Sequence, residues 1–226
     1  MKSPFTSSGP PRSSIPPTVW ALGLVSLFMD ISSEMIHSLL PLFLTGTLGV
    51  SVAFVGLIDG IAESTAAISK VFSGYISDKI GRRKPLILLG YSLGAFTKPF
   101  FVLGARFADR IGKGIRGAPR DALIADVTPP DIRGRAFGLR QAMDTAGAFA
   151  GPLLAIALMA LFASNIRAVF WVAVIPGMLA VLCVLLGVRE PDAATSSSQA
   201  KPPIDLKALR RLSPAFWTVV AIGVAF

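Results

Sequence analysis

The chain has 226 residues, of which 53% are hydrophobic and only 15% are charged, and its formal net charge is +9. Soluble domains carry about 25% charged residues, so this composition excludes an ordinary soluble protein and a disordered one, and it indicates helices that span a bilayer. The single cysteine, Cys183, excludes a disulfide framework, and the single histidine, His37, excludes a paired-histidine metal centre. We therefore expect no metal site and no cofactor.

Six stretches are long and apolar enough to cross a bilayer core about 30 Å thick, which requires roughly 20 residues for each helix. They follow a Pro- and Ser-rich tail, residues 1–18, that we expect to be disordered. The approximate limits of the predicted spans are 17–44, 53–77, 85–103, 103–125, 142–163 and 168–188. Together they predict an all-α, polytopic membrane bundle of six transmembrane helices over residues 19–188.

A polar linker, residues 189–213, separates this bundle from the start of a seventh transmembrane helix at 214–226. The first part of the linker is a flexible polar run. The second part, IDLKALRRL, is typical either of a short amphipathic helix whose basic residues meet phospholipid headgroups or of a solvated linker. The seventh stretch covers only about 20 Å, too short to cross, so we expect a complete six-helix half whose second, C-terminal half is missing.

Basic residues outside the predicted spans are distributed asymmetrically. They lie in the tail, near 78–84, near 127–140 and in the linker, all on one side of the membrane, whereas the other side carries only Arg167. By the positive-inside rule the basic side is cytoplasmic, and so is the N-terminus. Since the positive charge lies in membrane loops or helices, we expect no nucleic-acid partner.

The most specific motif is GYISDKIGRRK, between the second and third predicted spans. Gly74 allows close approach of a neighbouring helix, and Gly81 permits a tight turn. Asp78 stands at a helix end where it can pair with a cation, and Arg82 and Arg83 offer bidentate donors to carboxylates. A plain positive-inside loop with turn residues is the alternative interpretation, which this spacing disfavours.

At these residues the chain resembles the major facilitator superfamily of secondary transporters, in the signature loop between helices 2 and 3. Arg106-Phe107 followed by IGKG is similar to the family's helix 4 motif. The segment GAFAGP, with Gly147, Gly151 and Pro152, is similar to the helix 5 motif associated with proton-coupled exporters, although small residues at this spacing also simply let helices pack. The resemblance covers the N-terminal half of the family's usual twelve helices.

The resemblance implies a mechanism of alternating access, in which two six-helix bundles rock around a central cavity. It also implies that the signature loop holds the cytoplasmic gate in the outward-open state. In this sequence that role would fall to Asp78, Arg82 and Arg83, with Gly74 and Gly81 shaping the loop.

Charged residues inside the predicted spans are expensive in lipid, so each should face protein or a water-filled cavity. Helical spacing puts them on one face of each helix: Asp30, Glu34 and His37 on the first span, Asp59, Glu63 and Lys70 on the second, and Arg106, Asp109, Arg110, Lys113, Arg116 and Arg120 on the fourth. Either most of them form structural ion pairs between helices, or the fourth helix lines a polar cavity and an acid on the first or second helix carries a coupling proton. The candidates for binding a proton or a substrate are Asp30, Glu34, Asp59, Glu63, Arg106, Asp109, Arg110 and Lys113.

The third and fourth predicted spans leave little room for a connection. The stretch from Pro85 to Asp126 must supply both, and nothing between Phe101 and Arg106 resembles a loop. We therefore expect these helices to be short or to be joined by a tight turn at Gly104.

The function that these observations favour is secondary active transport of a small solute by alternating access, as proton-coupled export with protons as the coupling ion. Two alternatives remain: uptake of an anionic metabolite, suggested by the basic stripe, and a non-transporting truncated fragment. An enzyme lacks support, since the sequence offers no His/Asp pair, cysteine nucleophile or metal-ligand set. We expect an integral protein of a bacterial-type inner (plasma) membrane that does not transport as this chain alone, because alternating access needs two bundles.

Overall fold

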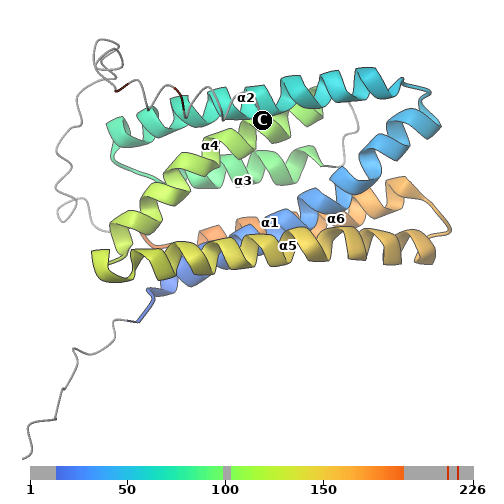
Figure 1. Ribbon diagram of the computed structural model, residues 1–226. Coiled ribbons are helices and arrows are strands. Elements are labelled where there is room, and N and C mark those ends of the chain that lie inside the picture. The colour runs from blue at the N-terminus through green and yellow to red at the C-terminus, as the bar shows by residue number, and fades with distance from the viewer. Residues whose placement is uncertain (1–13, 99–102, 191–212, 214–217, 219–226) are drawn as a thin grey trace, which may run out of the picture. The chain divides into compact units, whose positions relative to one another are not determined.

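A computed structural model describes residues 14–98, 103–190, 213 and 218, and every structural statement below concerns these residues (Figure 1). They form six α-helices and no strand, which confirms the all-α prediction. The helices are α1 (Pro17–Leu42), which continues into a π-helical turn (Phe43–Thr47), α2 (Val52–Ile80), α3 (Lys84–Thr97), α4 (Leu103–Val127), α5 (Arg133–Leu161), preceded by a short 3-10 turn (Pro130–Ile132), and α6 (Ile166–Gly187).

Local sequence explains where several helices begin and end. The Ser51 side chain caps α2 by accepting a hydrogen bond from the Phe54 amide at 3.3 Å, and Asn165 caps α6 in the same way. Gly81 ends α2 in the left-handed conformation, with φ at 68°, a backbone geometry that glycine adopts without strain.

Four of the helical segments are long and apolar enough to cross a membrane: Pro17–Thr47, Val52–Ile80, Pro130–Leu161 and Ile166–Gly187. The third helix, α3, has 14 residues and is as short as expected, whereas α4 has 25 residues but carries charge along its length. Gly104 lies inside α4 and not at a turn, so the expected turn there was wrong. The connection 99–102 lies outside the described residues.

The start of α5 differs from the sequence prediction. The region 127–140 was expected to be a loop, but α5 begins at Arg133, so Arg135 and Arg140 are helical. The apolar stretch that predicts a span begins only where hydrophobicity rises. It gives no sign of the charged first turns of α5. The expected linker at 189–213, apart from residues 189, 190 and 213, and most of the expected tail and seventh helix lie outside the described residues.

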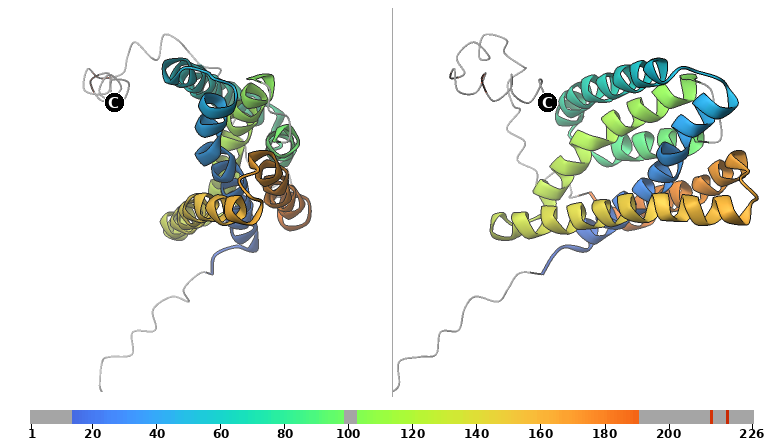
Figure 2. Two further views of the ribbon diagram at one scale, coloured as in Figure 1. Left: turned by 90° about the vertical axis from the view of Figure 1, so that its right-hand side faces the viewer. Right: turned by 45° about the vertical axis from the view of Figure 1, so that its right-hand side comes forward.

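The six helices form two groups of three. The α1 helix packs along α5 and α6, and α4 packs along α2 and α3, while α3 also contacts α6 (Figures 1 and 2). A buried apolar cluster that includes Leu22, Tyr91, Leu123 and Val184 joins the groups through α1, α3, α4 and α6. A second cluster, which includes Phe170, lies within the group of α1, α5 and α6.

Glycines allow the closest helix contacts. A Cβ atom on Gly147 would lie 2.5 Å from the Leu27 carbonyl oxygen, and one on Gly151 would lie 2.6 Å from the Glu34 Cβ. Pro152 follows inside the same helix. The GAFAGP segment therefore sits where α5 approaches the α1 backbone, as small residues at helix interfaces do.

Candidate functional site

The loop between α2 and α3 is tied to the end of α4 by Arg83. Its guanidinium donates from Nε to Asp126 Oδ2 at 2.5 Å and from Nη1 to Asp78 Oδ1 at 3.0 Å and Ser77 Oγ at 3.1 Å. Burial lowers the pKa of Arg83, but hydrogen bonds from its side chain to Asp126 and Asp78, and the charges of both acids, outweigh burial and leave that pKa above its ordinary value. Arg83 thus stays charged at every physiological pH.

The same loop is also tied to the end of α6. The backbone amides of Arg83 and Lys84 both donate to Glu190 Oε1, the second at 3.3 Å, and Lys84 Nζ donates to the Leu185 carbonyl at 3.2 Å. A carboxylate at the first turn of α3 also compensates the helix dipole. We call Ser77, Asp78, Arg83, Asp126 and Glu190 the loop clamp.

The five residues expected to form the gate differ in the contacts that they make. Asp78 and Arg83 are paired, and Gly81 forms the turn. A Cβ on Gly74 would lie 3.2 Å from the Ala118 Cβ, so α2 does approach α4 there. Arg82, by contrast, is exposed and makes no hydrogen bond or ion pair with any residue that the structure describes. Sequence reasoning missed Asp126 and Glu190, although both are acids at the ends of predicted spans on the same side as the arginine loop.

Arg83→Gln should lower the free energy of unfolding by about 1–2 kcal/mol, because it removes charge-assisted hydrogen bonds to partly exposed acids. The pKa of Arg83 is higher in the folded protein than in the unfolded chain. The stabilisation that its charge gives the folded protein is therefore complete at every pH below the ordinary arginine pKa. The loss should therefore be the same at any pH from mildly acidic to mildly alkaline, and it should shrink in high salt.

Thermal unfolding of the purified protein in detergent measures this difference. Arg82→Gln is the matched control, since it removes the neighbouring charge without a described contact, and we expect it to change stability by less than about 0.5 kcal/mol. Equal destabilisation by both substitutions would contradict the loop clamp.

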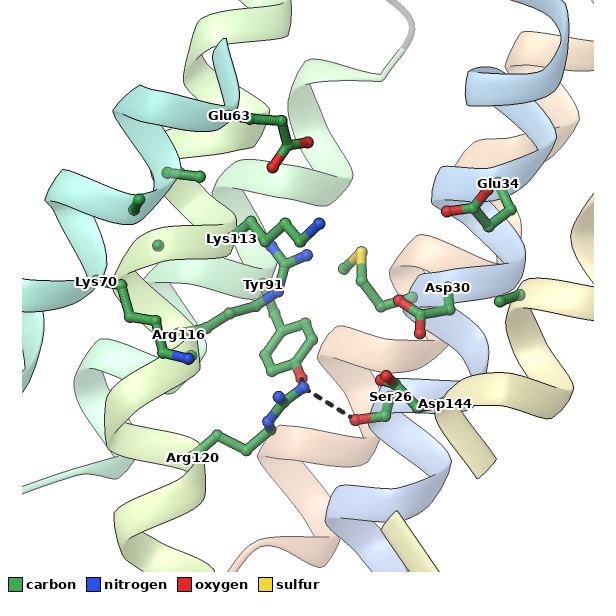
Figure 3. Close-up of a pocket in the computed structure, with 16 residues that line it drawn as sticks. Ser26, Asp30, Glu34, Glu63, Lys70, Tyr91, Lys113, Arg116, Arg120 and Asp144 are labelled. Carbon is green, nitrogen blue, oxygen red and sulfur yellow. Dashed lines mark hydrogen bonds between the residues drawn. The ribbon is translucent and has the colours of Figure 1, made fainter. Parts of the chain in front are cut away.

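A cavity of about 460 Å³ lies among α1, α2, α3, α4 and α5, within the usual range of small-molecule sites (Figure 3). Its polar and charged lining residues are Ser26, Asp30, Glu34, Glu63, Lys70, Tyr91, Lys113, Arg116, Arg120 and Asp144. Four of the predicted proton- or substrate-binding residues line this cavity: Asp30, Glu34, Glu63 and Lys113.

Three of the other four predicted site residues, Asp59, Arg106 and Arg110, take part in ion pairs between α2 and α4. Arg106 is hydrogen-bonded to Asp59, and Arg110 Nη1 lies 2.5 Å from Glu63 Oε1. The Arg110 side chain is only 1% exposed, and its Nη2 also lies 3.2 Å from His37 Nδ1 on α1.

Asp109 of α4 lies next to the ion pair of Arg110 with Glu63. One oxygen of its carboxylate lies 3.9 Å from Arg110 Nε, and the other is buried without a hydrogen-bond partner in the part of the chain that the structure describes. For the pairs of α2 with α4, the structure therefore agrees with the structural-pairing interpretation.

The acids of α1 are arranged differently. No lysine or arginine nitrogen of the described residues lies within 4.0 Å of the carboxylate of Asp30 or Glu34. Glu34 has His37 at 3.8 Å, and Asp30 is close enough to Asp144 of α5 for the two carboxyl groups to interact. Asp144 also lies 3.5 Å from Arg140, one turn earlier on α5.

Two arginines are held in place on the α4 side of the cavity. Arg116 lies over the Tyr91 ring, with its guanidinium carbon 4.8 Å from the ring centroid, and it donates to the Gly90 carbonyl at 3.3 Å. Arg120 donates to the Tyr91 hydroxyl at 3.3 Å and to Ser26 Oγ at 3.1 Å. Both guanidinium groups are therefore fixed before any ligand arrives.

Sequence reasoning missed three of the cavity residues. Asp144 is an acid inside a predicted span, so the rule that flagged the other intramembrane charges would have found it. Ser26 and Tyr91 are neutral residues in apolar stretches, and nothing in the sequence marks them.

Comparison with known proteins gives consistent results. Residues 22–226 match the family model described as Major Facilitator Superfamily. The uncharacterised MFS-type transporter MJ1317 of Methanocaldococcus jannaschii is 33% identical over 186 residues, which cover 79% of this chain and 46% of that protein. The multidrug resistance protein MdtH of Photorhabdus laumondii is 29% identical over 137 residues, or 57% of this chain and 34% of that protein. The chain thus spans less than half the length of these curated relatives.

Solved structures share the fold. The human organic anion transporter MFSD10 aligns with a TM-score of 0.66 at 19% identity, over 79% of this chain and 49% of that one. A peptide transporter POT in complex with alafosfalin aligns with a TM-score of 0.70 at 16% identity, over 93% of this chain and 47% of that one.

Proposed function

Because the chain belongs to the Major Facilitator Superfamily, a family of membrane transporters and not of enzymes, we propose that it forms one half of a secondary transporter that exports a small solute in exchange for protons. The observation that carries this proposal is the position of Asp30 and Glu34, which line the cavity without a lysine or arginine partner among the described residues. An unpaired carboxylate at membrane depth is costly, and binding a proton removes its charge.

Alternating access in this proposal requires a second six-helix bundle across the cavity. The chain spans under half of its curated relatives, and the cavity walls described here come from one bundle only. We place the loop clamp and the N-terminus in the cytoplasm of a bacterial-type inner membrane, since the basic residues outside the spans gather on that side. In the proposal, the loop clamp holds the cytoplasmic ends of α2, α4 and α6 together in one of the two access states.

Asp30→Asn should abolish proton-driven flux while solute exchange at equal pH persists, because the amide retains the size of the side chain and can no longer carry the proton. The measurement is flux by the full-length protein in proteoliposomes with an imposed pH gradient. Asp131→Asn, at an exposed position before α5, removes a comparable charge away from the cavity and should leave flux unchanged.

The proposal of proton coupling fails if Asp30→Asn, Glu34→Gln and Asp144→Asn all retain the pH dependence of transport. A variant that lowers the folded yield instead reports a structural role, so yield is measured beside flux.

Uptake of an anionic metabolite is the second candidate, and the observation that favours it is the row of bases on the cavity wall, namely Lys70, Lys113, Arg116 and Arg120. The same proteoliposomes distinguish the two candidates. An exporter that exchanges solute for protons moves the two in opposite directions, whereas a symporter of anions moves them in the same direction.

A further inference from the structure

The charges of the cavity are divided between two walls. One wall, on α2 and α4, carries the basic residues Lys70, Lys113, Arg116 and Arg120. The acid Glu63 lies on the same wall, but its carboxylate is paired with Arg110. The facing wall, on α1 and α5, carries the acids Asp30, Glu34 and Asp144 (Figure 3). If the charged residues of the cavity served only as structural ion pairs, these opposite charges would be in contact.

The two walls do not neutralise each other. Among the described residues, no nitrogen of the basic wall lies within 4.0 Å of a carboxylate oxygen of the acidic wall. The ion pairs that these residues do form are with neighbours on their own helix: Glu34 with His37 at 3.8 Å, Arg120 with Asp121 at 3.3 Å and Asp144 with Arg140 at 3.5 Å. Opposite charges therefore face each other across open space at membrane depth, where unpaired charge is costly.

The basic wall is suited to an anionic group with two or more oxygens. Arg116 is buried against Tyr91, and Arg120 is fixed by hydrogen bonds to Tyr91 and Ser26. A guanidinium group offers paired donors that match a carboxylate or phosphonate. Because these donors are already in position, a ligand would lose little free energy in ordering them.

The acidic wall is suited to a cation. Asp30 and Glu34 lie one helical turn apart on α1, and an ammonium group with its three donors can hydrogen-bond to carboxylates at this spacing. Neither acid has a lysine or arginine partner among the described residues. The Asp30 carboxyl group interacts with Asp144 and Glu34 has His37 at 3.8 Å, and an ammonium group would use the acceptor positions that these two contacts leave.

We propose that the cavity binds a small zwitterion, with a carboxylate or phosphonate group against Arg116 and Arg120 and an ammonium group against Asp30 and Glu34. The statement that this ligand is the transported solute rests on the function proposed above, whereas its binding does not. A ligand that carries both charges neutralises both walls at once, which a simple anion or cation cannot do.

The test is equilibrium titration of the full-length protein in lipid nanodiscs, without any ion gradient. The probes are linear ω-amino acids with two, four and six carbons, each compared with the carboxylic acid and the alkylamine of the same carbon number. We expect at least one amino acid to bind about tenfold or more tightly than its matched acid and amine, since each charged contact contributes about that factor.

Two substitutions should test the two ends of the ligand one at a time. Asp30→Asn should weaken the best amino acid by about tenfold and leave its matched carboxylic acid unchanged, while Arg116→Gln should weaken the amino acid and leave the amine unchanged. Arg120→Gln, at the other arginine of the proposed anion site, replaces Arg116→Gln if loss of the buried Arg116 prevents folding. The exposed positions Asp131→Asn and Arg167→Gln remove matched charges outside the cavity and should change nothing.

A merely structural role for these residues would weaken every probe alike, and that result would overturn the proposal. So would equal affinity for an amino acid and its matched acid, or saturable binding of none of the amino acids. Amino-acid binding without proton-driven flux would refute the transport proposal and leave the site intact. Proton-driven flux of a solute, with no preference for zwitterions, would support the transport proposal and overturn the proposed zwitterion site.

Discussion

Glu63→Gln should lower the free energy of unfolding by about 3 kcal/mol, because it removes the carboxylate 2.5 Å from Nη1 of Arg110, whose side chain is 1% exposed. Removing one partner of a buried ion pair costs about 3–5 kcal/mol, since the other charge remains buried without compensation. We expect the lower end of that range, since Glu63 is half exposed and Asp109 lies 3.9 Å from Arg110. Thermal unfolding in detergent, together with the folded yield from membranes, measures the effect.

A double substitution gives the matched control. Glu63→Leu with Arg110→Leu removes both charges of the pair, and it should recover part of the stability that Glu63→Gln loses, because neither partner is then left without the other. Recovery should be incomplete, since Asp109 loses its neighbour Arg110. If Glu63→Gln is as stable as the wild type, Arg110 does not depend on this carboxylate and the described pairing of α2 with α4 is wrong.

Gly151→Ala should destabilise the protein even though alanine favours helices. The new Cβ would lie 2.6 Å from the Glu34 Cβ, 3.0 Å from the Ile31 carbonyl oxygen and 3.2 Å from the Met35 amide nitrogen. Two of these are backbone atoms, so α1 and α5 must move apart. Overpacking costs about 1–3 kcal/mol, and the three contacts at 2.6–3.2 Å favour the upper part of that range, about 2–3 kcal/mol. Alanine gains about 1 kcal/mol in helix propensity, so we expect a net loss of about 1–2 kcal/mol.

Gly138→Ala provides the control on the same helix. A Cβ at Gly138 would meet nothing within 4 Å, so alanine there should stabilise the protein by about 0.5–1 kcal/mol through helix propensity alone. The opposite signs of the two substitutions, read from the same unfolding assay, would locate the effect at the contact of α5 with α1. A stabilising Gly151→Ala would show that the two helices are farther apart.

Much of the helical framework could be predicted from the sequence because long apolar stretches fix where helices lie in a bilayer. The start of α5 could not, since its first turns are charged and the apolar signal begins several residues later. The length of α3 was anticipated from the short stretch between Pro85 and Asp126, but the turn at Gly104 was not supported, because glycine at this position is accommodated within α4.

The candidate site, too, could be predicted from the sequence only in part. Helical spacing predicts which charges of one helix share a face, but spacing within one helix contains no information about the partner on another. The pairing of Arg110 with Glu63, and the absence of such a partner for Asp30, therefore became visible only in three dimensions. The contact of Arg83 with Asp126 joins segments far apart in the chain for the same reason.

The grouping of the helices also has a consequence for how the protein is made. One group joins helices from both ends of the sequence, since α1 packs on α5 and α6, whereas the other consists of the consecutive helices α2, α3 and α4. About 90 residues separate the end of α1 at Leu42 from the start of α5 at Arg133, which at roughly 5–20 residues per second takes the ribosome about 5–18 s. During that interval the face of α1 that carries Asp30 and Glu34 lacks the contacts that α5 makes with it through Gly147 and Gly151. Packing of this face therefore waits for the translation of α5.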